Sequence, residues 1–207
     1  MNRRDPQQTF EDADPLFKSL MAQNPQFSCA SVNYRLSPDV QHPDHQSDVI
    51  ASLMFLKQEY GMDEFIIIGH SAGACLAFQS AEHVPTCRAI VGIEGIYDLR
   101  DLVQEYPNYE DFVESAFGQD KGLWGTASPI HIVTRWSNCS DVIVQLIQSM
   151  EDELLGPRQT EQMFSILQQN CFNLQEIGWI NGTHDSSITS FECHTLVHTL
   201  ISRVFKT

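Results

Sequence analysis

Short strand-like runs and longer helix-like runs alternate along this chain. Runs of four to eight residues rich in β-branched side chains predict strands, and apolar residues spaced three to four apart predict helices. The predicted strands are Cys29–Tyr34, Phe65–Ile68, Ala89–Glu94, Asp141–Gln148 and Leu174–Trp179. The predicted helices are Glu11–Gln23, His45–Tyr60, a helix directly after Ser71, Arg158–Gln169 and Cys193–Phe205.

This alternation predicts an α/β fold, in which helices cover both faces of a mostly parallel sheet. A length of 207 residues fits one domain over residues 1–207. The stretch from Leu99 to Phe117 is helical but irregular, and Tyr106-Pro107 interrupts it. We therefore expect a lid-like helical insertion above the strand ends at about residues 99–117.

Acidic residues dominate the charge of the chain, with 27 Asp and Glu against 12 Lys and Arg and a formal net charge of −15. Nucleic-acid binding depends on Lys and Arg replacing counterions, so we expect no nucleic-acid partner. The same charge gives no attraction to an anionic membrane surface. No apolar run is long enough to span a bilayer, and the first residues lead into polar sequence, which predicts a cytoplasmic protein.

The six cysteines are scattered and form no C-x-x-C pair. Disulfide scaffolds and zinc ribbons need clustered spacings, so these cysteines are predicted to be reduced core residues. They are Cys29, Cys75, Cys87, Cys139, Cys171 and Cys193.

The clearest chemical signal follows the strand Phe65–Ile68, where the sequence reads Gly69-His70-Ser71-Ala72-Gly73. A G-x-S-x-G turn between a strand and a helix lifts the serine hydroxyl out as a nucleophile. Such a turn forces close backbone approach, and Gly69 and Gly73 are predicted to supply the missing side chains. Ser71 is therefore the predicted nucleophile.

A serine nucleophile needs a base that accepts its proton and an acid that orients the base. On a sheet of this kind the chain order is Ser, then the acid after one late strand, then His after the next. His184 lies in a glycine-containing loop after the last predicted strand and is the predicted base. Three carboxylates, Glu151, Asp152 and Glu153, follow the preceding strand and compete for the acid position.

The other histidines have structural interpretations. His70 fills the tight turn beside the nucleophile. His194 and His198 lie four apart on a predicted helix, but no third ligand lies nearby, so no metal site is predicted. The proposed chemistry requires no metal or organic cofactor, because side chains supply the nucleophile and the acid–base groups.

With these residues in place the chain resembles the α/β-hydrolase superfamily and, within it, the fungal type of kynurenine formamidase. The first two of four matching stretches are shared by many esterases, and the last two are more specific to the formamidases. The stretches are Asn33-Tyr34-Arg35-Leu36-Ser37-Pro38; Gly69-His70-Ser71-Ala72-Gly73; Glu94-Gly95-Ile96-Tyr97-Asp98-Leu99 with Glu105-Tyr106-Pro107; and Asp152-Glu153-Leu154-Leu155 with Arg158-Gln159-Thr160.

The resemblance implies hydrolysis of N-formyl-L-kynurenine to L-kynurenine and formate, a step of tryptophan breakdown that feeds NAD synthesis. It aligns Asp152 with the family's acid, beside Ser71 as nucleophile and His184 as base. The backbone N–H of Ala72 is the implied oxyanion donor. The family also implies a small-molecule substrate and a homodimer.

One part of the family's pattern is absent from this sequence. Related hydrolases carry early strands and a His-Gly-Gly-x-Trp loop that contributes to the oxyanion hole, and residues 4–9 resemble the segment that follows this loop. We therefore expect a hydrolase fold without those strands and that loop. A shortened start site of a working enzyme and a true short form both fit. Two other functions stay open: a general small-ester carboxylesterase, and a hydrolase-fold binding protein with weak or no turnover.

Overall fold

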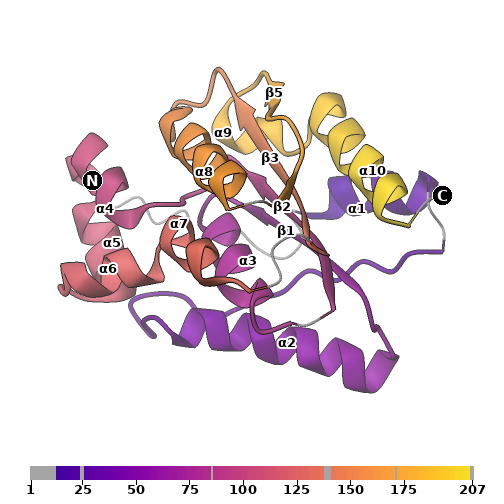
Figure 1. The fold of residues 1–207 in the computed structure, drawn as a ribbon, viewed down its shortest axis with the longest axis horizontal. Helices are drawn as coiled ribbons and strands as arrows, with labels where there is room; N and C mark the ends of the chain where they lie inside the picture. The colour runs from indigo at the N-terminus through magenta and orange to yellow at the C-terminus, as the bar shows by residue number, and fades with distance from the viewer. Residues whose placement is uncertain (1–12, 24–25, 85, 138–140, 171, 206–207) are drawn as a thin grey trace.

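A five-stranded, fully parallel sheet forms the centre of the protein (Figure 1). The computed structural model describes residues 13–23, 26–84, 86–137, 141–170 and 172–205. The strand order is β1-β2-β3-β4, and β5 also pairs with β3. The strands are β1 (Phe65–His70), β2 (Cys87–Ile93), β3 (Ile143–Ser149), β4 (Asn173–Leu174) and β5 (Gly178–Ile180).

Helices cover both faces of this sheet, which confirms the predicted α/β fold. Helices α1 and α10 lie side by side on one face, and α2, α3 and α8 pack on the other (Figure 1). The helices are α1 (Asp14–Gln23), α2 (Asp44–Tyr60), α3 (Ala72–Ala81), α4 (Leu99–Glu105), η2 (Pro107–Tyr109), α5 (Glu110–Phe117), α6 (Lys121–Ala127), α7 (Pro129–Ile132), η3 (Val133–Arg135), α8 (Arg158–Gln169), α9 (His184–Ser187) and α10 (Phe191–Phe205).

Strand β2 shows how the two cores form. Ile90 belongs to the cluster under α2, α3 and α8, whereas Ala89, Val91 and Ile93 belong to the cluster under α1 and α10. Successive side chains of a strand point to opposite faces, so a strand covered on both sides needs a continuous apolar run. Each large side chain buried in this way stabilises the fold by about 1.5–3 kcal/mol.

The predicted strand Cys29–Tyr34 is wrong, because this segment is extended but is not part of the sheet. Its side chains do alternate: Val32 and Tyr34 pack against the core cluster under α2, whereas Ser31 and Asn33 are exposed. A strand also needs a neighbour for its backbone hydrogen bonds. Among the described residues, no strand pairs with this segment to supply them.

The predicted strand Leu174–Trp179 is divided into β4 and β5. Both pieces pair with β3, β4 at Ile143 and Val144 and β5 from Ile147 onward. Between them the side-chain amide of Gln145 donates to the carbonyl of Glu176 at 2.8 Å. A side chain thus takes the place of a ladder hydrogen bond, which interrupts the strand.

The stretch predicted to be helical, at residues 99–117, contains α4, η2 and α5, and further short helices follow it. Asp98 caps α4 by accepting from the N–H groups of Arg100 and Asp101, and Pro107 begins η2. The short elements α6, α7 and η3 were not predicted, because three to seven residues are too few to show a helical period. Trp124, 1% exposed, lies in the core cluster that joins this region to the loop after β2.

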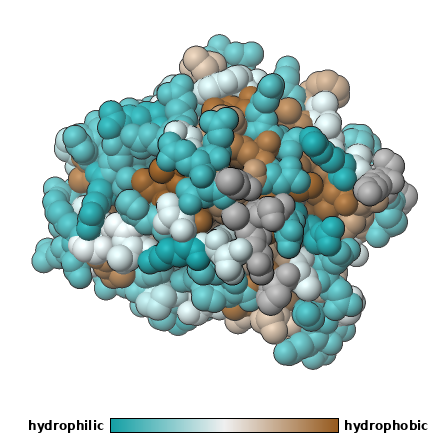
Figure 2. Space-filling view, in the orientation of Figure 1, coloured by the Kyte–Doolittle hydropathy of each residue, from teal (hydrophilic) through white to brown (hydrophobic). Residues whose placement is uncertain are grey.

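Hydrophilic residues cover most of the face shown in Figure 2, which agrees with the high net charge. No helix among the described residues has the length and apolarity to cross a membrane. Cys75, Cys87 and Cys193 are free and buried as predicted, and Cys29 is free and half-buried. Cys139 and Cys171 lie outside the described residues.

Candidate active site

Ser71 stands between β1 and α3 in a strained backbone conformation, with φ 54° and ψ −121°. A non-glycine residue with positive φ is uncommon and persists where the surroundings hold it. Here the Ser71 N–H donates to the carbonyl of Ile93 at 3.0 Å, and the Ser71 carbonyl accepts from Ile96 at 3.3 Å. The end of β2 therefore holds the strained turn, in the predicted strand–serine–helix arrangement.

The two glycines of this turn differ. A Cβ added at Gly69 would lie 2.2 Å from the carbonyl oxygen of Gly73, so no side chain fits at Gly69. An added Cβ at Gly73 meets nothing within 4 Å, so the expectation that crowding requires Gly73 is wrong. Only Gly69 is therefore crowded, because the backbone at the start of α3 passes directly over it.

His184 and Asp152 are brought together at the carboxyl ends of β3 and β5. Nδ1 of His184 lies 2.8 Å from Oδ2 of Asp152, and their side chains are 4% and 0% exposed. The other carboxylate oxygen, Oδ1, accepts from the N–H groups of Leu154 and Leu155 at 2.8 Å each. These bonds hold the carboxylate in place and leave Nε2 of His184 for a further partner.

The three rival carboxylates have different contacts. Asp152 contacts the imidazole, whereas Glu151 accepts from the backbone N–H of Gly182 and Glu153 accepts from the N–H of His184, each at 3.0 Å. The shorter side chain thus contacts the ring, and the two longer ones hold the loop that carries it.

Burial and pairing act in opposite directions on the two groups. Burial alone lowers the pKa of His184, but the hydrogen bond and charge of Asp152, with smaller contributions from Glu94 and Asp185, raise it above its ordinary value. Burial alone raises the pKa of Asp152, but hydrogen bonds from His184, Leu155 and Leu154 bring it below the ordinary value. Pairing therefore favours an imidazolium beside a carboxylate.

The segment that carries Ser71 contacts His184 through His70. The rings of His70 and His184 have centroids 4.5 Å apart, and His70 directly precedes Ser71. Within the described part of the chain, no hydrogen bond joins the Ser71 hydroxyl to His184. Such bonds are often long in ligand-free enzymes and tighten when substrate binds.

Ala72, the predicted oxyanion donor, is the first residue of α3. The first N–H groups of a helix have no acceptor within the helix, and they point toward the positive end of its dipole. The Ala72 N–H therefore suits an anion that develops beside Ser71.

A second buried carboxylate, Glu94, lies in the same cluster and was not predicted as a site residue. Its Oε2 accepts from Ser187 at 2.6 Å and lies 3.1 Å from His70 Nε2 and 3.7 Å from His184 Nδ1. The feature of the sequence that could have indicated Glu94 is its position as an acidic residue directly after the apolar strand β2. Polar residues at the carboxyl ends of parallel strands meet at one edge of the sheet.

Three side chains of this site have atoms that could bind a metal ion. Donor atoms of His70, Glu94 and His184 lie within 4.8 Å of one another. Zinc binds such N and O donors at about 2.0–2.2 Å. In this arrangement, however, the atoms already bond to one another, to Ser187 or to Asp152, so the geometry is that of a hydrogen-bonded cluster.

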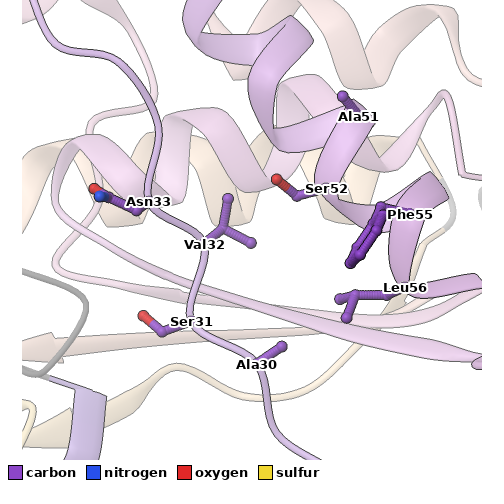
Figure 3. A pocket seen from close by; sticks show the side chains of 8 residues that line it. All are labelled: Ala30, Ser31, Val32, Asn33, Ala51, Ser52, Phe55 and Leu56. Carbon is purple, nitrogen blue, oxygen red and sulfur yellow. The ribbon is translucent and has the colours of Figure 1, made fainter. Parts of the chain in front are cut away.

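A pocket of about 440 Å³ lies away from these residues, between the extended segment and α2 (Figure 3). Ala30 to Asn33 line one wall, and Ser52, Phe55 and Leu56 are among the residues of the other. None of the candidate residues lines it, so it contributes nothing to the site.

A parallel sheet with a strained serine after β1, an acid after β3 and a histidine after β5 has the architecture of an α/β-hydrolase. Residues 7–167 match the BD-FAE family, an α/β-hydrolase family. Among solved structures, the bifunctional GH43-CE protein of Bacteroides eggerthii has a TM-score of 0.78 at 17% identity, covering 94% of this chain and 32% of that one. A truncated carbohydrate esterase from gut microbiota has a TM-score of 0.70 at 15% identity, covering 86% and 74%.

Proteins of similar sequence identify the family within the α/β-hydrolases. A kynurenine formamidase of Meyerozyma guilliermondii is 35% identical over 88% of this chain and 74% of its own length. The kynurenine formamidase of Aspergillus versicolor is 36% identical over 68% of this chain and 62% of its own length. The chain belongs to the kynurenine formamidase family, as its motifs predicted.

Proposed function

We propose that this protein is a serine hydrolase that cleaves N-formyl-L-kynurenine to L-kynurenine and formate. The observation that carries the proposal is the strained Ser71 turn beside the buried His184–Asp152 pair, in a chain of the kynurenine formamidase family. The substrate follows from the names of the relatives, and the reaction class follows from the site.

In the proposed reaction, Nε2 of His184 takes the hydroxyl proton of Ser71 while Oγ attacks the formyl carbon. Asp152 holds Nδ1 and stabilises the imidazolium. His184 returns the proton to the aniline-like nitrogen, the C–N bond breaks, and L-kynurenine leaves. Water, activated by His184, then cleaves the formyl ester of Ser71 and releases formate.

The oxyanion formed at the formyl carbonyl needs hydrogen-bond donors. We assign the N–H of Ala72 to this role, because it follows the nucleophile at the start of α3. Loss of one oxyanion donor typically lowers kcat by about 10²–10³.

The setting of the reaction belongs to the same proposal. Hydrolysis of N-formylkynurenine places the protein in tryptophan breakdown toward NAD. Free thiols at Cys75, Cys87 and Cys193 support a reducing compartment such as the cytoplasm. The lid role of residues 99–117 and the homodimer stay predictions.

Purified protein given N-formyl-L-kynurenine and a nitrophenyl acetate ester tests the function. We expect release of formate and L-kynurenine, loss of turnover in Ser71→Ala, and no change in Ser47→Ala, which alters an exposed serine on α2. A fluorophosphonate probe should label Ser71 in the wild type and not in Ser71→Ala.

Two results contradict the proposal in different ways. Cleavage of the nitrophenyl ester alone identifies a general carboxylesterase. Absence of both turnover and labelling identifies a binding protein with a hydrolase fold.

A further inference from the structure

Glu94 occupies a place where a carboxylate is unexpected. It follows β2 directly, its side chain is 0% exposed, and its φ is 47°. Its N–H donates to the carbonyl of Ile147 at 2.8 Å, which continues the pairing of β2 with β3. A non-glycine residue rarely adopts this backbone conformation, and such strain persists where surrounding contacts maintain it.

The carboxylate of Glu94 joins the element that carries the candidate nucleophile to the element that carries the candidate base. On one side it lies 3.1 Å from His70 Nε2, at the end of β1 and next to Ser71. On the other side it accepts from Ser187, the last residue of α9, the helix that His184 begins. His70 Nε2 also lies 3.0 Å from the carbonyl oxygen of His184, which closes the link.

The same carboxylate adds charge beside the imidazole. Oε2 of Glu94 lies 3.7 Å from Nδ1 of His184, too far for a hydrogen bond but close enough for a strong charge interaction. Its other oxygen, Oε1, is buried and has no hydrogen-bond partner among the described residues. The negative charge of Glu94 is therefore only partly balanced by donors.

We propose that Glu94 is a positioning residue of this site: its buried carboxylate anchors α9 through Ser187, orients His70, and is a second negative charge beside the imidazole of His184. The proposal rests on the proposed function for its catalytic consequence. Asp152 binds Nδ1 of His184 directly. Glu94 instead acts on His184 through its negative charge and through its contacts with His70 and Ser187.

Several titratable groups face His184, so the test must separate their effects. They are Asp152 after β3, Glu94 after β2, His70 at the end of β1, Asp185 on α9 and Glu153 at the backbone N–H of His184. Glu94→Gln removes one charge and retains an oxygen that accepts from Ser187. A structural role alone would leave the protonation of His184 unchanged in this variant.

The experiment is an NMR titration of labelled histidine imidazoles, with the His184 signal assigned by His184→Gln. We expect Glu94→Gln to lower the pKa of His184 by about one unit. Asp101→Asn, which neutralises a buried carboxylate outside the site, should leave it unchanged. In turnover of N-formylkynurenine, Glu94→Gln should lower kcat roughly tenfold at constant KM.

Ser187→Ala supplies a second variant in case Glu94→Gln does not fold. It removes the hydrogen bond and keeps the charge, so we expect an unchanged pKa of His184 and a kcat lowered roughly threefold. An unchanged titration in Glu94→Gln, or an unchanged kcat in Ser187→Ala, would overturn the proposal.

The titration needs no turnover, which separates the two proposals. A wild-type protein that fails to hydrolyse the substrate contradicts the proposed function and leaves the effect of Glu94 on His184 measurable. An active wild-type enzyme whose His184 titrates identically in Glu94→Gln contradicts the role of Glu94 alone.

Discussion

Two buried carboxylates of this protein, Asp152 and Asp101, pair with different types of side chain. Asp152 pairs with His184, and both side chains are nearly inaccessible. Asp101, on α4, forms two hydrogen bonds with Arg158 at the start of α8, and the arginine side chain is 51% exposed. The first pair contains a group whose charge changes near neutral pH, and the second contains a permanent cation.

This difference distinguishes a pair that is able to transfer a proton from a pair that only stabilises the fold. An arginine keeps its proton throughout, so the Asp101–Arg158 pair joins two helices and transfers nothing. A histidine held by a buried carboxylate is able to take a proton and return it. The type of partner, a titrating histidine or a permanently charged arginine, distinguishes the two regions, rather than burial of the acid.

The largest expected effect comes from neutralising each acid in turn. Asp152→Asn should lower kcat by about 10⁴, because the imidazolium loses its carboxylate and the favoured tautomer changes. Asp101→Asn should retain kcat and lower the melting temperature by roughly 2–4 °C, as expected for a loss of about 1 kcal/mol in a domain of this size. Steady-state kinetics and thermal unfolding measure both.

Equal losses of kcat in the two variants would contradict this comparison. A retained kcat in Asp152→Asn would assign the acid role to another carboxylate, of which Glu94 is the next in distance from Nδ1.

The pH dependence of kcat/KM should reveal the titrating pair. His184 must be neutral to accept a proton, and its pKa is raised by Asp152 against the effect of burial. Activity should therefore fall on acidification at a higher pH than for an ordinary histidine, whose pKa is about 6.5. In Asp152→Asn the residual activity should show this fall at lower pH, because the contributions of Asp152 that raise the pKa of His184 are then lost.

If kcat/KM of the wild type falls on acidification with a pKa at or below the ordinary histidine value, the assignment of His184 as the base paired with Asp152 is contradicted. Asp101→Asn is the matched control, and its fall on acidification should coincide with that of the wild type.

The smallest effect is expected at the acidic neighbours of Asp152. Among the described residues, Glu153 accepts a hydrogen bond from the backbone N–H of His184 alone, and a glutamine oxygen accepts the same bond. Glu153→Gln should change kcat by less than about threefold, since only the strength of one charge-assisted hydrogen bond changes. A loss as large as that of Asp152→Asn would show that Glu153 holds the imidazole during turnover.

Local patterns predicted the parts of this site that lie close together in the chain. The turn around Ser71 is visible because an apolar strand, a glycine that permits close approach and a helix occur within a few residues. His184 was predicted as the base from its place after the last strand, since the order of strands limits where a distant base can lie. The contacts of Asp152 agree with the acid that the resemblance favoured.

Long-range contacts explain what the patterns missed. The role of Glu94 depends on His70 and Ser187, which are 24 and 93 residues away in the chain. The segment Cys29–Tyr34 has the alternation of a strand, but a strand requires a hydrogen-bonding neighbour that its own side chains do not reveal.

The amino-acid sequence by itself determined the α/β architecture, the family and the identity of a serine, a histidine and an acid in hydrolase order. The architecture and the serine turn follow from hydrophobic period and turn chemistry, which act over a few residues. The histidine and the acid follow from the order of the strands, and the family follows from the resemblance of the motifs. Only the tertiary structure decided which of three neighbouring carboxylates contacts the imidazole, and that a further carboxylate lies beside it. Those choices depend on distances of 2.8–3.7 Å between side chains at separate strand ends, which only the packed sheet sets.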